Sequence, residues 1–225
     1  MVYNFNGIEY KTVKKFFSRV NSVFLIERTN DNSKYILKDF EDNSDRITAE
    51  LEGMNIFKDQ SPKLIFSDDR YIVHEFIPGE TFVLHFEEAE KKASDPEILT
   101  TPLLNFLKSM YEYAPGYILS DINFTNFIVS NNNCIKFIDF ENVCQGEIED
   151  DLGRIVAFAL TYNPAFSEWK YKFAIYFIKS SIEILKVSEE KIFLYIKKEF
   201  EAMKIRRNIK IDIPDILKRI KKGSY

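Results

Sequence analysis

Short runs of alternating apolar and polar residues dominate the first third of the chain, and this period of two is typical of half-buried β-strands. Turn-forming residues separate the runs, most densely from Thr29 to Ser33. One stretch instead has apolar residues at helical spacing, with Ile47, Leu51 and Met54 on one side. The pattern predicts strands at Lys11 to Phe17, Val20 to Arg28, Lys34 to Phe40, Lys63 to Phe66 and Arg70 to Phe76, and a helix at Arg46 to Phe57.

The pattern changes after Ile77-Pro78-Gly79-Glu80, a sequence that breaks regular structure. From there the spacing is mostly helical, beginning with a charged segment, Phe86 to Ala93, that we expect to be exposed. Thr101 followed by Pro102 predicts the start of the next helix. Asp151 to Tyr162 predicts an apolar helix that begins with an acidic residue, and Glu168 to Lys186 predicts a helix that is apolar on most sides and therefore buried. We therefore expect two parts, residues 1–78 and 79–225.

Composition indicates a soluble globular protein, with 45% apolar and 29% charged residues. The two cysteines, Cys134 and Cys144, form no CxxC motif, so neither a disulfide framework nor a zinc site is predicted. Cys134 begins an apolar run and is expected in the core. Because the chain shows no signal-peptide pattern and no bilayer-spanning apolar run, we expect a cytoplasmic protein.

Positive charge gathers near the C-terminus of a chain whose net charge is −4. Residues 204–222 hold eight Lys or Arg and two Asp, a net charge of +6, so the remaining chain carries −10. This basic tail could contact an anionic partner such as a phosphate, RNA or a membrane surface. The alternative is a solvated helix with one charged face.

Lys38 shares a face of its predicted strand with Ile36 and Phe40, which are apolar. A lysine in such a position needs an anion, unless its stem packs while its amine reaches solvent. Glu50, beside the apolar side of the predicted helix, is the candidate anion.

The stretch from Tyr117 to Asp151 contains three candidate site residues, each with an oxygen atom in its side chain. Asp121 comes after one apolar run, Asn126 five residues later, and Asp139 within the next apolar run, where alternation places it with Phe137. A lone carboxylate on an apolar face is costly unless it is paired or binds a cation, and Asp and Asn oxygens suit Mg²⁺. The layout is typical of a phosphoryl-transfer site. The alternative is a β-hairpin with one polar position at its exit.

In this order the motifs resemble the protein-kinase-like superfamily over nearly the whole chain, and most closely its aminoglycoside phosphotransferase and choline kinase branch. The resemblance implies an α+β fold of two lobes, an antiparallel-sheet lobe with one helix and a mostly helical lobe. It also implies ATP and Mg²⁺ as cofactors.

The resemblance also implies a role for each matched residue. Lys38 in YILKDF would position the nucleotide, with Glu50 as its partner. The remaining roles would be Asp121 as catalytic base, Asn126 and Asp139 as metal ligands, Asp151 of DLGR as the brace of the catalytic loop, Glu75 and Ile77 as the hinge that meets adenine, and Asn21 and Ser22 in the loop that covers the nucleotide.

Three features depart from the family pattern. Leu119 replaces the histidine usual two residues before the catalytic Asp. The nucleotide-covering loop, Ser18-Arg19-Val20-Asn21-Ser22, has no glycine, and β-branched Val20 restricts its backbone. The helical part is short for an antibiotic phosphotransferase. Only eleven residues separate Asp139 from Asp151, too few for a long regulatory activation segment.

The sequence is thus interpreted as an ATP- and Mg²⁺-dependent phosphotransferase that acts on the hydroxyl group of a small molecule, such as an aminoglycoside, choline or a sugar. One alternative is a small atypical kinase that acts on proteins or glycolipids. Another is a pseudokinase that serves as an interaction module, which Leu119 and the glycine-free loop favour.

Overall fold

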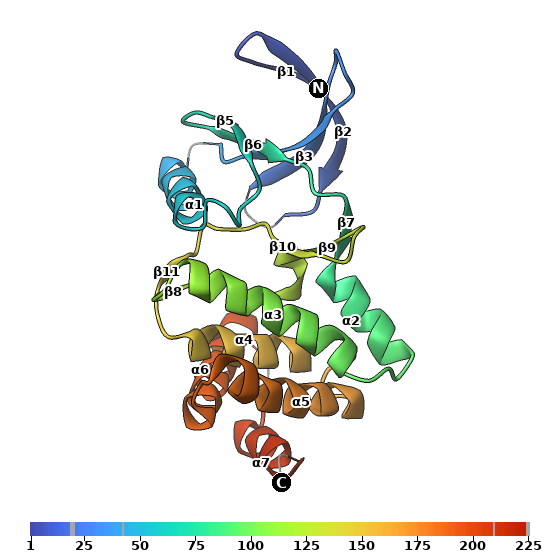
Figure 1. The fold of residues 1–225 in the computed structure, drawn as a ribbon, viewed down its shortest axis with the longest axis vertical. Helices are drawn as coiled ribbons and strands as arrows, with labels where there is room; N and C mark the ends of the chain where they lie inside the picture. The colour runs from blue at the N-terminus through green and yellow to red at the C-terminus, as the bar shows by residue number, and fades with distance from the viewer. Residues whose placement is uncertain (19–20, 42, 209, 224–225) are drawn as a thin grey trace. The chain divides into compact units, whose positions relative to one another are not determined.

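The structure, a computed structural model, describes residues 1–18, 21–41, 43–208 and 210–223 (Figure 1). It divides into two compact units. Unit 1 comprises Met1–Pro78 and Phe137–Asn142, and unit 2 comprises Gly79–Lys136 and Val143–Tyr225. The short segment that carries Asp139 therefore packs with unit 1, although it follows the chain's passage through much of unit 2.

Unit 1 is built on an antiparallel sheet with strand order β1-β2-β3-β4-β6-β5. The pattern of alternation did not predict the first strand, which pairs with the second across Asn6-Gly7. Both turn residues have positive φ, 50° and 79°, as a tight hairpin with an Asn-Gly turn requires. The elements are β1 (Val2–Phe5), β2 (Ile8–Phe16), β3 (Ser22–Arg28), β4 (Lys34–Asp39), α1 (Ser44–Ile56), β5 (Leu64–Ser67) and β6 (Tyr71–Glu75).

Strand β4 lies inside the sheet, and its pairing sets the position of Lys38 between Val23 of β3 and Ile72 of β6. Helix α1 packs on the sheet through Ile47, which is buried with Phe40 and Ile72. A second apolar cluster supports the sheet farther from α1 and consists of Phe5, Tyr10, Phe24, Ile26, Leu37 and Val73.

Unit 2 is mainly helical, with α4 packed on α6 and α3 packed on α5. Its small sheets have the orders β10-β9-β7 and β11-β8, and β10 ends at a residue of unit 1. None of the helices in the described ranges is both long and apolar enough to cross a bilayer. The elements are β7 (Gly79–Thr81), α2 (Phe82–Lys91), α3 (Glu97–Tyr113), β8 (Tyr117–Ile118), the 3-10 helix η1 (Phe124–Asn126), β9 (Phe127–Ser130), β10 (Ile135–Phe137), β11 (Cys144–Gln145), α4 (Ile148–Thr161), α5 (Glu168–Leu185), α6 (Glu189–Arg207) and α7 (Ile213–Gly223).

An aromatic cluster fixes the start of η1 in the core of unit 2. The ring of Phe124 lies 4.9 Å from that of Phe82, 5.0 Å from Phe86 and 5.5 Å from Tyr162. Its backbone N–H also donates to the Tyr162 hydroxyl at 2.8 Å. The loop that begins at Asp121 is therefore anchored at its far end by a buried side chain.

Several local predictions were wrong. Helix α3 begins at Glu97, and Pro102 lies inside it, because the buried residues Leu99, Leu103 and Leu107 hold the helix against the core on both sides of the proline. The charged segment after residue 85 is not simply exposed, since Phe86 and Ala89 are buried.

Two expectations about the second apolar run were also wrong. Cys134 is exposed rather than in the core, because strand β10 begins only at Ile135. The same strand ends at Phe137, so Asp139 lies beyond it and its direction does not follow from strand alternation.

Candidate active site

Lys38 stands at the centre of a buried ionic cluster in unit 1. Its Nζ atom donates to Glu50 Oε1 at 2.7 Å, to Asp139 Oδ1 at 3.2 Å and to the carbonyl of Ile138 at 3.2 Å. The side chains of Lys38 and Glu50 are 9% and 1% exposed, whereas that of Asp139 is 30% exposed. The predicted pairing of Lys38 with Glu50 is present, and Asp139 is the member of the cluster that solvent can reach.

The two carboxylates of the cluster stabilise the charged form of Lys38. Burial by itself lowers the pKa of Lys38, but the charges of Asp139 and Glu50 outweigh burial and raise it above its ordinary value. Burial raises the pKa of Glu50, Lys38 opposes that rise, and Asp139 adds to it. Because two carboxylates face one amine, Lys38 remains an ammonium at neutral pH.

Glu141 brings a third carboxylate to the same place. Single oxygens of Glu50, Asp139 and Glu141 lie within 4.8 Å of one another. Glu50 Oε2 and Glu141 Oε2 are buried and have no hydrogen-bond partner among the described residues. Carboxylate oxygens are the ligands that Mg²⁺ prefers, so the residues present fit a divalent cation beside Asp139.

Arg46, one helical turn before Glu50, connects the same segment to the loop that the sequence predicts to cover the nucleotide. It donates through Nη2 to Glu141 and through Nη1 to Asn21 Oδ1 at 3.1 Å. Ser22 is the first residue of β3. Arg19 and Val20, which the sequence places in the covering loop, lie outside the described residues.

The predicted hinge begins at the end of β6. Glu75 is the last residue of that strand and is exposed, and Ile77 lies in the irregular segment before β7. His74, just before the hinge, is 3% exposed, and its Nδ1 lies 2.9 Å from the carbonyl oxygen of Glu75. Burial, together with the charge of Lys38, lowers the pKa of His74 to about 4.

This buried imidazole predicts a loss of stability in acid. The folded-state pKa of about 4 lies below the ordinary value of 6.5, so the stability that neutral His74 contributes is complete above pH 6.5 and is lost as the pH falls toward 4. The loss should be about 3 kcal/mol in the free energy of unfolding between pH 7 and pH 4. Urea unfolding of the wild type and of His74→Asn across this range measures it. The difference in the free energy of unfolding between the two proteins should decrease by that amount from pH 7 to pH 4. If the two proteins lost stability equally over this range, the prediction would be contradicted.

The loop that carries Asp121 is held by local hydrogen bonds in unit 2. Asp121 Oδ1 accepts from Asn123 Nδ2 at 3.0 Å, and the Asp121 carbonyl accepts from Asn126 Nδ2 at 2.9 Å. Asn123 also caps η1, since its Oδ1 accepts from the backbone N–H of Thr125. Leu119, at the position of the family's histidine, is fully buried.

Asp151 holds the start of this loop from α4. Its carboxylate accepts from the backbone N–H groups of Leu119 and Ser120 and from the Tyr111 hydroxyl, each at 2.9 Å. Ser120 has a φ of 63°, a conformation that costs a non-glycine residue about 1–2 kcal/mol. The carboxylate therefore stabilises a strained backbone immediately before Asp121.

Burial raises the pKa of Asp151 to about 6, although its three hydrogen bonds oppose the rise. Since the folded value exceeds the ordinary 3.8, this group favours the folded state below pH 3.8, and that contribution is lost as the pH rises through 6. The sign is opposite to that of His74, so the pH dependence of the wild type alone would not isolate His74.

The predicted site residues thus form two groups. Unit 1 brings Lys38, Glu50 and Asp139 together, and unit 2 brings Asp121, Asn126 and Asp151 into one loop and its support. Arg46 and Glu141 were not predicted. Their signals are the spacing of Arg46 four residues before Glu50 and of Glu141 two residues after Asp139, each on a segment already singled out.

No protein-family model and no curated protein matches the chain. A solved structure of an ethanolamine kinase from Plasmodium vivax does match, with a TM-score of 0.57. The match covers 97% of this chain and 82% of that chain at 13% sequence identity. The chain has a protein-kinase-like fold. At this identity the match shows the fold that the motifs predicted, whereas the roles of the individual residues are proposals.

Proposed function

We propose that the protein is an ATP- and Mg²⁺-dependent phosphotransferase that moves the γ-phosphoryl group to a hydroxyl group of a small molecule. The observation that carries the proposal is the burial of Lys38 between Glu50 and Asp139. Burial of these charged groups costs hydration free energy, and apolar residues of similar volume often stabilise a fold at least as well. Stability therefore does not account for the cluster. A function does, because phosphoryl transfer needs an ammonium positioned for phosphate and a carboxylate positioned for the metal.

The residues have the following proposed roles. Lys38, held by Glu50, would orient the α and β phosphates. Asp139 and Asn126 would hold Mg²⁺, which would supply positive charge to offset that of the phosphates. Asp121 accepts the proton of the attacking hydroxyl, and the hydrogen bond from Asn123 orients its carboxylate. Glu75 and Ile77 offer backbone groups to adenine, and Asn21 and Ser22 belong to the covering loop.

A cationic amino alcohol or aminoglycoside is the acceptor class that best suits this chain. Outside residues 204–222 the chain carries a net charge of −10, which favours cations. The protein that shares the fold is named as an ethanolamine kinase, and an acceptor of that kind has both an amine and a hydroxyl group.

A nucleotide-binding interaction module is the second candidate. It is favoured by Leu119, which is buried and offers no polar group where the family has a histidine. Both candidates bind nucleotide, so a binding test does not distinguish them. Only the phosphotransferase transfers phosphate to an acceptor, so turnover distinguishes the two.

Thermal unfolding with ATP, in the presence and absence of Mg²⁺, tests the nucleotide site. A ligand that binds only the folded state adds about 2.7 kcal/mol at 100 times its Kd, which should raise the Tm of a chain of this size by about 5–10 °C. We expect a Mg²⁺-dependent rise in the wild type that is lost in Asp139→Ala. Asp69→Ala, an exposed turn position in the same unit, should keep it. An equal rise in Asp139→Ala would remove Asp139 as the metal ligand, and no rise in the wild type would reject the nucleotide site.

A further inference from the structure

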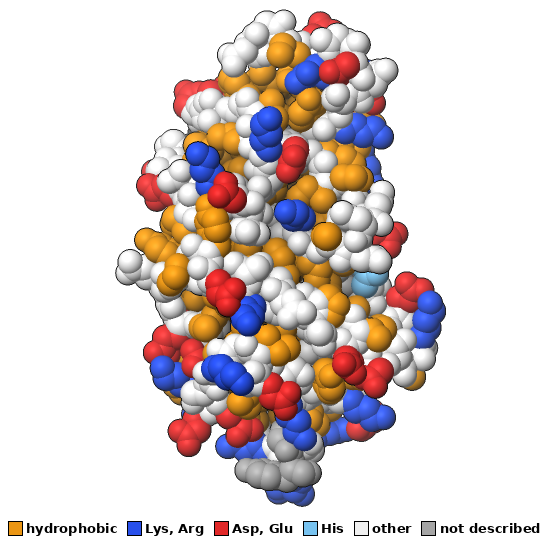
Figure 2. Space-filling model, in the orientation of Figure 1, with side chains coloured by type: hydrophobic (Ala, Val, Ile, Leu, Met, Phe, Trp, Pro, Cys, Tyr) orange, Lys and Arg blue, Asp and Glu red, His pale blue; other side chains and the backbone are white. Residues whose placement is uncertain are grey.

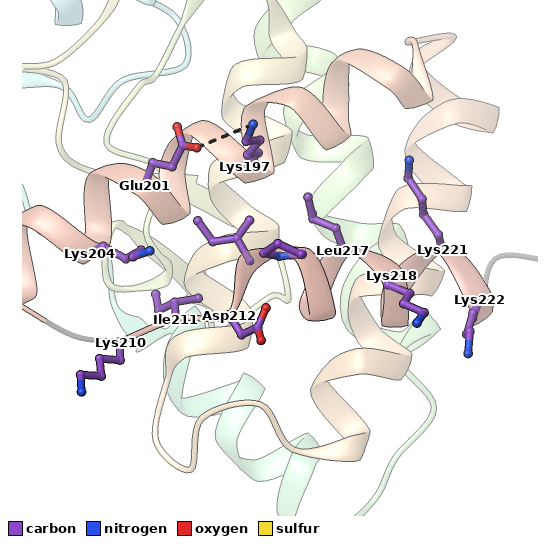
Figure 3. Close-up of a pocket in the computed structure, with 12 residues that line it drawn as sticks. Lys197, Glu201, Lys204, Lys210, Ile211, Asp212, Leu217, Lys218, Lys221 and Lys222 are labelled. Carbon is purple, nitrogen blue, oxygen red and sulfur yellow. Dashed lines mark ion pairs between the residues drawn. The ribbon is translucent and has the colours of Figure 1, made fainter.

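An open groove of about 1300 Å³ lies in unit 2 between the second half of α6, the segment that follows it, and α7 (Figure 3). Strands β8 and β9, which flank the Asp121 loop, lie at the opposite end of this unit from α7 (Figure 1). The groove is therefore separate from the proposed catalytic loop. Its lining residues are Lys197, Glu201, Lys204, Lys210, Ile211, Asp212, Ile213, Pro214, Leu217, Lys218, Lys221 and Lys222.

The groove concentrates positive charge, with six lysines against Glu201 and Asp212. Lys197 pairs with Glu201 at 3.8 Å, the contact drawn as a dashed line in Figure 3. Within the described part of the chain, no ion pair is found for Lys204, Lys210, Lys218 or Lys222. Blue side chains accordingly gather around the α7 end in Figure 2.

Several basic side chains on other helices of this unit form ion pairs. Lys92 lies 2.6 Å from Glu88, Lys108 lies 3.8 Å from Glu112, and Arg154 lies 2.7 Å from Asp150, each pair at helical spacing. The arginines near the groove are also paired, Arg206 with Glu199 and Arg219 with Glu168. Exposed lysines without an ion pair in the described part of the chain also occur elsewhere on this unit, for example Lys91, Lys172 and Lys179. The groove differs because four such lysines line one concave surface, and this clustering indicates an anionic ligand.

The groove also has an aliphatic component and no aromatic side chain among its described lining residues. Pro214 and Leu217 contribute exposed and partly exposed apolar surface between the lysines. A nucleic-acid backbone would gain little binding free energy from this aliphatic surface, and the described lining residues offer no aromatic ring on which bases could stack. Apolar side chains of a peptide, by contrast, would be removed from water there.

The rest of the chain argues against an extended polyanion. Outside residues 204–222 the net charge is −10, so a nucleic acid or an anionic bilayer that extended beyond the groove would contact protein of like net charge. Bilayer insertion would need the apolar face of α7, but Ile213, Ile216 and Ile220 of that face are buried in the protein.

We propose that the groove is a docking site for a short acidic peptide segment of a partner protein. Carboxylates of the segment contact Lys204, Lys218 and Lys222, and its aliphatic side chains pack on Pro214 and Leu217. The segment is short enough that its charge stays within the basic region.

Fluorescence anisotropy with a short labelled peptide in which Glu alternates with Leu tests the proposal on the full chain. Deletion of α7 is unsuitable because it would expose the parts of α5 and α6 that α7 contacts. The combined variant Lys204→Glu, Lys218→Glu and Lys222→Glu should weaken peptide binding by about tenfold or more. The matched control, Lys91→Glu, Lys172→Glu and Lys179→Glu, changes the net charge equally at exposed positions outside the groove. It should change the affinity by less than about twofold at ~0.15 M salt.

Three further probes complete the test. The same peptide with Ser in place of Leu should bind more weakly than the original. A single-stranded RNA of equal charge and vesicles of phosphatidylserine should both bind more weakly than the original peptide. The proposal is overturned if the wild type does not bind the peptide, or if the triple Lys→Glu variant of the groove binds it with unchanged affinity. It is also overturned if the Ser peptide binds as tightly as the Leu peptide. Tighter binding of RNA or vesicles through the same lysines would likewise overturn it. Should the reversal variant fail to fold, the triple Lys→Gln variant at the same positions gives the same comparison.

Discussion

Asp121→Ala is expected to lower the turnover of phosphoryl transfer by about 10²–10⁴-fold, the usual contribution of a positioned general base. Nucleotide binding should be unchanged, because in the proposed mechanism Asp121 contacts the acceptor hydroxyl and not the phosphates. Release of ADP in the presence of ethanolamine, choline, aminoglycosides and sugars measures turnover. The same assay gives the KM for ATP, and that KM should stay near the wild-type value.

The comparison with Asp139→Ala makes this prediction specific, since that variant should lose both turnover and Mg²⁺-dependent nucleotide binding. Asp215→Ala, an exposed position on α7 in the same unit as Asp121, serves as the matched control and should retain full turnover. Wild-type turnover in Asp121→Ala would reject Asp121 as the base. Nucleotide binding without turnover on any acceptor in the wild type would favour the interaction module.

Asp151→Ala is expected to destabilise the protein by about 3 kcal/mol or more, because it leaves two buried donors and one partly buried donor without their acceptor. These donors are the backbone N–H groups of Leu119 and Ser120 and the hydroxyl of Tyr111. The strained backbone at Ser120 would also lose its support, so turnover should fall together with stability. Urea unfolding at pH 7 measures the change in free energy.

Tyr111→Phe is the informative companion to this variant. It removes one hydrogen bond while the two backbone donors keep theirs, so the expected loss is about 1 kcal/mol and turnover should stay near the wild-type value. If Asp151→Ala proved as stable as Tyr111→Phe, the carboxylate would not be the support of the loop.

Local spacing accounts for most of the elements that the sequence predicted. Alternation located β3, β4 and β6, and apolar residues at helical spacing located α1, because these periods follow from the geometry of a single strand or helix. Capping is equally local, since the Ser188 side chain caps α6 by accepting from the N–H of Lys191. The order of the motifs was sufficient to predict a protein-kinase-like fold, which the solved structure of an ethanolamine kinase also has.

Contacts between distant segments explain features of these helices that spacing along the sequence does not indicate. Gly53, which weakens α1 on propensity alone, is required there because a Cβ atom would lie 2.1 Å from the carbonyl oxygen of Phe140. Lys170, in a helix predicted from its apolar spacing, is fully buried and satisfied by Glu90 and by the carbonyls of Tyr162 and Pro164. Neither fact can be obtained from neighbours in the sequence.

The sequence by itself therefore determined the elements, the motif order and the pairing expected between Lys38 and Glu50. Only the tertiary structure decided that Asp139 returns to unit 1 to complete the cluster, that Arg46 holds Glu141, and that unpaired lysines of α6 and α7 line one groove. The physical reason is that periodicity and capping depend on residues a few positions apart. Close approach of backbone segments and the balance of charge in a cluster depend on residues that only folding brings together.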